Sequence, residues 1–206
     1  MLVAFFIVVQ YVGRATGGGQ ETDPLYRWSF AAGSLIQEGI FLLIVLAIAG
    51  FSAQRLGLRL PKLKWRAVGL AVAGFFVIQI FEFAYIALAH PGNEQGLTPT
   101  RWQPSHAAQY IVNGVIVCTL VPFVEEVTFR GLGFYLLRGY GTWLAIIGTG
   151  ILFGLSHGLV IALPIIVVFG CVLGWIRENT ESVFPGMVLH SAFNLIALVA
   201  AVTVHG

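Results

Sequence analysis

The chain has 206 residues, of which 58% are hydrophobic and only 10% are charged. A soluble domain carries about 25% charged residues, so this composition predicts an integral membrane protein. The net charge of +2, without basic runs interleaved with aromatic residues, argues against nucleic-acid binding. Cys118 and Cys171 both lie in apolar segments, where we expect them to pack rather than to form a disulfide or a metal-binding pair.

Apolar segments along the chain predict the membrane spans, each of which needs about 20 mostly apolar residues. We interpret residues 2–12, which are apolar but short, as a first span, with a signal-like segment as the alternative. Pro164 is expected to mark the turn before the fifth of the remaining six candidates. Those candidates are 30–53, 67–90, 107–124, 142–161, 162–176 and 183–204. The predicted fold is an all-α, polytopic transmembrane bundle of about seven spans. It forms a single domain over 1–206, with a motif-bearing core at about 105–204.

The basic residues predict the orientation of the bundle. Loop 54–66 holds five arginines and lysines, whereas loop 91–105 holds only Arg101. The positive-inside rule therefore places 54–66 in the cytoplasm and 91–105 outside. Alternation brings the chain back to the cytoplasmic side just after Glu125, which predicts a polar cavity open to the cytoplasm.

Proline and glycine are expected to interrupt the helix that begins at 107. Pro122 removes one helical hydrogen bond and crowds the carbonyl four residues earlier, which predicts a kink. In lipid, the freed backbone must be satisfied by neighbours or by water, so a wet cavity is expected there. Gly131 and Gly133 are expected to break the helix just after Arg130, with 134–138 along the interface.

Three short motifs place polar side chains inside these apolar segments. They are Glu125-Glu126-Val127-Thr128-Phe129-Arg130, Phe153-Gly154-Leu155-Ser156-His157 and His190-Ser191-Ala192-Phe193-Asn194. Ionisable groups at membrane depth are rare and usually face a protein interior or a wet cavity. Such residues on three separate segments are therefore candidates for a shared site.

The two glutamates of the first motif are expected to have different roles. Glu126 and Arg130 are four residues apart, which favours an ion pair on one helix face that supports the site. Glu125 is rotated by about 100° and has no local partner. It is therefore the candidate general base. The alternative is an interfacial charge cluster without a catalytic role.

The histidines supply the remaining candidates. His157 follows a stripe of glycines at four-residue intervals, which allows another helix backbone to approach closely. His190 and Asn194 are also four residues apart and could present two donors to a developing oxyanion. Either histidine, or Asn194, could instead form only a hydrogen bond between helices. Ser156 and Ser191 are poor nucleophile candidates, because adjacent helical residues point apart.

A zinc site is the competing arrangement of the same residues. Two histidines and one glutamate form a known catalytic ligand set, available here as His157, His190 and Glu125 or Glu126. The sequence has no His-Glu-x-x-His pattern, so zinc has no local signature. We therefore name no certain cofactor and keep zinc as an alternative.

The three motifs, in this order, resemble those of the type II CAAX prenyl endopeptidases and their prokaryotic Abi, or CPBP, relatives. The resemblance covers roughly residues 105–204. It implies an intramembrane endopeptidase in a prokaryotic cell membrane, with its active site towards the cytoplasm. The family is classed as metalloproteases, although a metal-free, glutamate-dependent mechanism fits its residues as well. The implied roles are water activation by Glu125 and His157, oxyanion stabilisation by His190 and Asn194, and support by Glu126 and Arg130.

The resemblance also implies partners, and it leaves alternatives open. The expected partners are membrane lipid and a peptide or protein substrate, lipidated if it is of the CAAX type. The alternative functions are a non-catalytic membrane partner, such as a bacteriocin immunity protein, and a small proton-coupled carrier. Glu38 and Glu82 are two further acids at membrane depth. Both could line the cavity or form a proton path. We expect Glu38, near an interface, to pair instead with a polar group on a neighbouring helix, and leave Glu82 unassigned.

Overall fold

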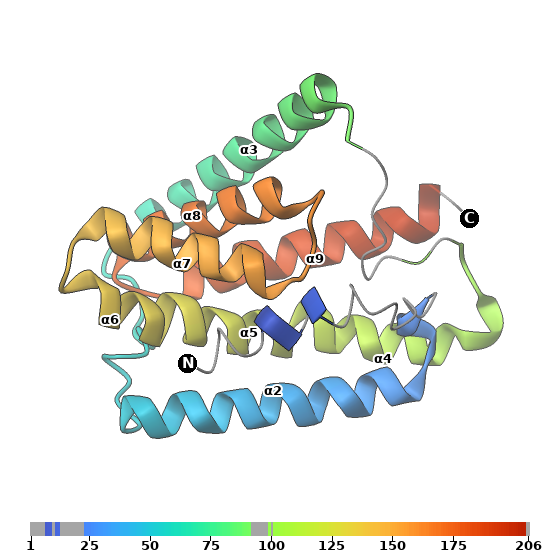
Figure 1. The fold of residues 1–206 in the computed structure, drawn as a ribbon, viewed down its shortest axis with the longest axis horizontal. Helices are drawn as coiled ribbons and strands as arrows, with labels where there is room; N and C mark the ends of the chain where they lie inside the picture. The colour runs from blue at the N-terminus through green and yellow to red at the C-terminus, as the bar shows by residue number, and fades with distance from the viewer. Residues whose placement is uncertain (1–6, 10, 13–22, 92–98, 100, 205–206) are drawn as a thin grey trace.

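The structure is a computed structural model, and it describes residues 7–9, 11–12, 23–91, 99 and 101–204. The ordered elements of this part are helices, which confirms the predicted all-α class (Figure 1). They are η1 (Pro24–Tyr26), α2 (Trp28–Ala49), α3 (Lys64–Ala89), η2 (Pro104–His106), α4 (Ala107–Cys118), α5 (Leu120–Glu126), the π-helix η3 (Val127–Gly133), α6 (Phe134–Arg138), α7 (Thr142–Ser156), α8 (Leu163–Thr180) and α9 (Phe184–Val204).

Five helical segments of the described part are long and apolar enough to cross a membrane. They are Trp28–Ala49, Lys64–Ala89, Pro104–Arg138, Leu163–Thr180 and Phe184–Thr203. The predicted count of seven is not confirmed. The predicted span 142–161 contains only the 15-residue helix α7. At 1.5 Å per residue such a helix is about 22 Å long, shorter than a hydrocarbon core of about 30 Å. The predicted span 2–12 lies mostly outside the described residues.

The path from α4 to α6 is the axis of the bundle (Figure 1). Helix α2 packs along α4, α5 and η3 on one side, and α9 packs against α4 and α5 on another. Helices α7 and α8 form a closely packed antiparallel pair, and α3 covers α8 and α9. The motif-bearing helices therefore occupy the interior, with α2 and α3 as outer walls.

The bend predicted near Pro122 is present, but the predicted break after Arg130 is not. Helix α4 ends at Cys118, and Thr119 leaves helical geometry (φ −125°, ψ −64°) before α5 begins. The chain then continues through η3 into α6 without interruption. Gly131 serves close packing instead, because a Cβ there would lie 2.7 Å from the carbonyl oxygen of Leu56.

The glycine stripe of α7 brings α8 into backbone contact, as the sequence predicted. A Cβ on Gly150 would lie 2.9 Å from the backbone nitrogen of Cys171. A Cβ on Gly154 would lie 3.2 Å from the backbone nitrogen of Val167. Any larger residue at either position would therefore force the two helices apart.

The turn between α7 and α8 follows a helix too short to cross the membrane. Gly158 (φ +65°) follows the end of α7. Pro164 lies in the first turn of α8 and not, as expected, in the turn before it. Two tyrosines donate to carbonyls of this turn: Tyr85 to Ile161 (2.9 Å) and Tyr11 to Leu159 (3.2 Å). Irregular backbone at membrane depth needs such partners, since lipid offers none.

One end of the bundle collects the basic residues. Arg59, in the α2–α3 loop, pairs with Glu181 (2.8 Å), and Arg138 pairs with Glu178 (2.7 Å). The α2–α3 loop, the α6–α7 turn and the α8–α9 turn all lie at this end (Figure 1). The clustering agrees with the positive-inside argument, while the cytoplasmic assignment itself stays a prediction.

Candidate active site

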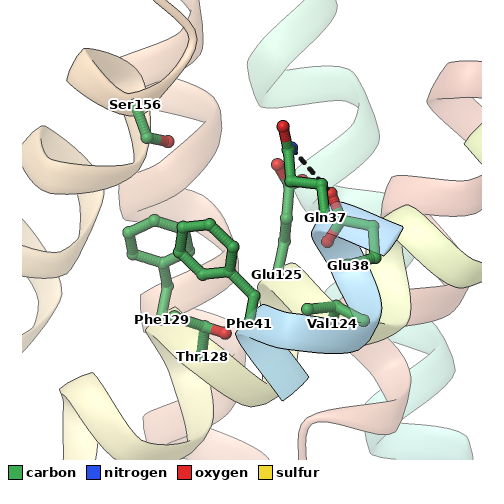
Figure 2. Close-up of a pocket in the computed structure, with 8 residues that line it drawn as sticks. All are labelled: Gln37, Glu38, Phe41, Val124, Glu125, Thr128, Phe129 and Ser156. Atoms are coloured by element: carbon green, nitrogen blue, oxygen red, sulfur yellow. Dashed lines mark hydrogen bonds between the residues drawn. The ribbon is translucent and has the colours of Figure 1, made fainter. Parts of the chain in front are cut away.

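A pocket with an empty volume of about 400 Å³ lies beside the first motif (Figure 2). Its lining comes from α2, α5, η3 and the end of α7. The lining residues are Gln37, Glu38, Phe41, Val124, Glu125, Thr128, Phe129 and Ser156. Two carboxylates, an amide and two hydroxyls therefore share one space whose remaining walls are apolar.

The ion pair predicted between Glu126 and Arg130 is present in the structure. Arg130 Nη1 donates to Glu126 Oε1 over 2.9 Å, and both side chains are fully buried. Arg130 Nη2 donates to the Gly170 carbonyl (2.9 Å), and the guanidinium lies 4.2 Å from the centre of the Phe153 ring. The pair joins η3 to α7 and α8, and it keeps a buried charge compensated.

His190 lies between the two glutamates. Its Nε2 is 3.6 Å from Glu125 Oε2, and its Nδ1 is 3.5 Å from Glu126 Oε1. Both separations exceed those of good hydrogen bonds. Accordingly, Glu125 Oε2 and His190 Nδ1 have no hydrogen-bond partner among the described residues. The phenyl rings of Phe153 and Phe169 pack edge-on to the imidazole and fix its place in α9.

His157 and Asn194 are not among the lining residues of the pocket, and each side chain is held by a backbone carbonyl. His157 Nδ1 lies 2.8 Å from the Phe153 carbonyl oxygen, which requires a proton on Nδ1 and leaves a lone pair on Nε2 of the neutral ring. Asn194 Nδ2 donates to the Val117 carbonyl (2.8 Å) just before the bend between α4 and α5. This contact is the hydrogen bond between helices that the sequence left as an alternative, and the second N–H of the amide is not used in it.

The proposed metal ligands do not come together. No group of three or more histidine, cysteine, aspartate or glutamate side chains in the described part of the chain could hold a metal ion. His190 approaches Glu125, but the two do not form such a group with His157. A zinc site needs its ligands at about 2.0–2.2 Å from one point. The zinc alternative built on His157, His190 and Glu125 is therefore not supported.

The pocket also includes residues that the sequence did not place in the site. Glu38 is 8% exposed and lines the pocket, and Gln37 Nε2 donates to its Oε1 (3.2 Å). The hydrogen bond to Glu38 thus comes from its own helix and not from a neighbouring one, and Glu38 takes the cavity-lining position that was the alternative expectation. Thr128 was read only as a spacer within the first motif. Glu82, which is half-buried in α3, is not among the lining residues.

The segment that contains all three motifs matches a known protein family. Residues 107–196 match the family model described as type II CAAX prenyl endopeptidase Rce1-like. The predicted family resemblance is confirmed for this segment. The family implies a peptidase within a membrane. The match does not extend to α2 and α3, so Gln37 and Glu38 lie outside it. No curated protein and no solved structure gives a significant match to the chain.

Proposed function

We propose that this protein is a CAAX-type intramembrane endopeptidase in which Glu125 is the general base. The observation that carries the proposal is the position of Glu125. It lines the pocket, its Oε2 has no hydrogen-bond partner among the described residues, and His190 Nε2 lies 3.6 Å away. A carboxylate that is free to accept a proton beside a pocket is what water activation requires.

The reaction follows from this placement. Glu125 takes a proton from a water in the pocket, and the water oxygen attacks the carbonyl carbon of the scissile peptide bond. His190 and the free N–H of Asn194 donate to the oxyanion. The Glu125 proton then passes to the leaving nitrogen as the C–N bond breaks, which gives a carboxylic acid and an amine. His157 assists in water activation, because its Nε2 can accept a hydrogen bond from the attacking water. The Glu126–Arg130 pair holds η3 in register with α7 and α8 and does not touch the reacting atoms.

The substrate is proposed to be a membrane-associated, lipidated peptide or protein. The family name supports a CAAX-type substrate, and the apolar walls formed by Phe41, Val124 and Phe129 suit a chain that approaches from lipid. The protein is proposed to lie in a prokaryotic cell membrane. The basic residues at one end of the bundle support an approach of the substrate from the cytoplasm. Hydrolysis at membrane depth needs water to reach Glu125, which the polar part of the pocket provides.

The test compares Glu125→Gln with a matched control. The protein is purified into lipid nanodiscs, and cleavage of a fluorogenic, farnesylated CAAX peptide is followed. Glu125→Gln should lose activity by at least about a hundredfold, since general-base catalysis contributes about 10²–10⁴-fold. Glu82→Gln removes an acid of α3 that does not line the pocket and should cleave as the wild type does. Equal rates for Glu125→Gln and the wild type would overturn the proposal.

A further inference from the structure

Thr128 behaves unlike the other threonines of the helices. Three of them donate their hydroxyl to the carbonyl four residues earlier: Thr149 to Ala145, Thr180 to Ile176 and Thr203 to Val199. Thr128 is only 8% exposed, and its hydroxyl oxygen is buried. This oxygen has no hydrogen-bond partner among the described residues. A buried hydroxyl without a partner is costly and calls for an explanation.

The position of Thr128 relative to Glu125 supplies that explanation. The two residues are one helical turn apart and line the same pocket (Figure 2). Thr128 lies at the start of the π-helix Val127–Gly133, where the regular α-helical hydrogen-bond pattern changes. Single π-helical turns are frequent at functional sites. The hydroxyl is thus free for a partner that enters the pocket.

The α2 wall of the pocket provides hydrogen-bond acceptors. Glu38 is only 8% exposed. Among the described residues, its carboxylate accepts one hydrogen bond, from Gln37 to Oε1. Its second oxygen is therefore available to accept. Glu38 and Glu125 are close enough to interact electrostatically across the pocket. Hence a donor on η3 and an acceptor on α2 share the space beside the candidate base.

A peptide backbone has the complementary chemistry. A substrate segment must be extended where it is cut, so its N–H and C=O groups lose their helical partners, and lipid offers no replacement. We propose that Thr128 and Glu38 form a subsite for the substrate backbone, with Thr128 donating to a peptide carbonyl and Glu38 accepting from a peptide N–H. This inference rests on the proposed function and adds two substrate-contacting residues to it, one of them outside the family match.

The experiment removes each group with a variant of nearly unchanged shape. In the same nanodisc assay with the farnesylated CAAX peptide, Thr128→Val should lower kcat/KM about tenfold, the effect of one lost hydrogen bond. Thr128→Ser keeps the hydroxyl and should recover most of the activity. Glu38→Leu should also lower kcat/KM about tenfold, whereas Glu38→Gln keeps an acceptor oxygen and should stay near the wild type.

A buried threonine elsewhere is the matched control. Thr149 is fully buried in α7, and its hydroxyl is satisfied by Ala145 and Ile146. Thr149→Val should leave kcat/KM unchanged. The thermal midpoint of Thr128→Val should be no lower than that of the wild type, because the substitution removes a buried hydroxyl that has no partner. Wild-type activity in Thr128→Val, while Glu125→Gln is inactive, would overturn the subsite and spare the proposed function. A Thr128→Val protein that loses folded yield and activity together, without rescue by Thr128→Ser, would make the hydroxyl structural and also overturn it. A wild type no faster than Glu125→Gln would overturn both proposals.

Discussion

Arg130 donates a hydrogen bond of 2.9 Å to Glu126, one helical turn earlier, and neither side chain has any exposed surface. The same guanidinium reaches the Gly170 carbonyl of α8 and lies over the Phe153 ring of α7. This buried pair therefore connects η3, which carries part of the first motif, to α7, which carries the second motif, and to α8, which packs against α7. We therefore expect the pair to contribute to the stability of the site rather than to the chemistry.

Glu126→Ala should destabilise the protein strongly. The substitution leaves Arg130 as an uncompensated buried charge, which costs about 3–5 kcal/mol. Thermal unfolding in detergent, followed by loss of soluble monomer, should show a clearly lower midpoint than that of Glu125→Gln. Glu178→Ala is the control, because its ion pair with Arg138 is partly exposed and is worth about 0–1 kcal/mol. An unchanged midpoint for Glu126→Ala would contradict the supporting role.

Gly150→Ala should separate α7 from α8. The added methyl group would lie 2.6 Å from Cys171 Sγ and 2.9 Å from the Cys171 backbone nitrogen, and the backbone cannot move aside easily. Overpacking of this kind costs about 1–3 kcal/mol. Gly39→Ala is the matched control, since nothing lies within 4 Å of a Cβ at that position in α2. Both variants can be compared by thermal unfolding, and similar midpoints would argue against tight α7–α8 packing.

Local relationships were predictable from the sequence because they depend on helix geometry alone. The Glu126–Arg130 pair follows from a four-residue spacing within one helix. The bend at Thr119 follows from Pro122, whose ring and missing N–H act on the preceding turn. The close approach of α8 to Gly150 follows from the small-residue stripe of α7. Each of these features requires knowledge of only one helix.

Relationships between helices were predicted less well. The direction of Asn194 depends on the bend after α4, which presents the Val117 carbonyl to it. The pocket position of Glu38 depends on how α2 packs along α5 and η3, and nothing in the sequence of α2 fixes that contact. The continuation of the helix past Gly131 depends on the Leu56 backbone, which uses the space that a side chain would fill. An acid at membrane depth was the one signal that pointed to Glu38.

Tyr85→Phe should loosen the turn that follows His157. The Tyr85 hydroxyl donates to the Ile161 carbonyl (2.9 Å), and its loss leaves that carbonyl without this donor at membrane depth. One lost hydrogen bond is worth about 1 kcal/mol, so amide hydrogen exchange in residues 157–162 should become faster while the fold persists. Tyr140→Phe, at an 82% exposed position, should leave this exchange unchanged. Identical exchange in both variants would show that the tyrosine does not hold the turn.

Hydrolysis should survive removal of metal ions. The prediction follows from the arrangement of the donors: among the described residues, no three histidine, cysteine, aspartate or glutamate side chains are grouped so that they could hold a metal ion, although His190 lies beside Glu125 and Glu126. A zinc ion would need all three at about 2.0–2.2 Å. Treatment of the nanodisc-embedded protein with a strong zinc chelator, followed by its removal, should leave kcat/KM for the farnesylated peptide unchanged. A zinc peptidase treated in parallel should lose its activity and regain it with added zinc. Stoichiometric zinc in the purified, active protein, lost together with activity in His157→Ala and His190→Ala, would contradict the glutamate-based mechanism.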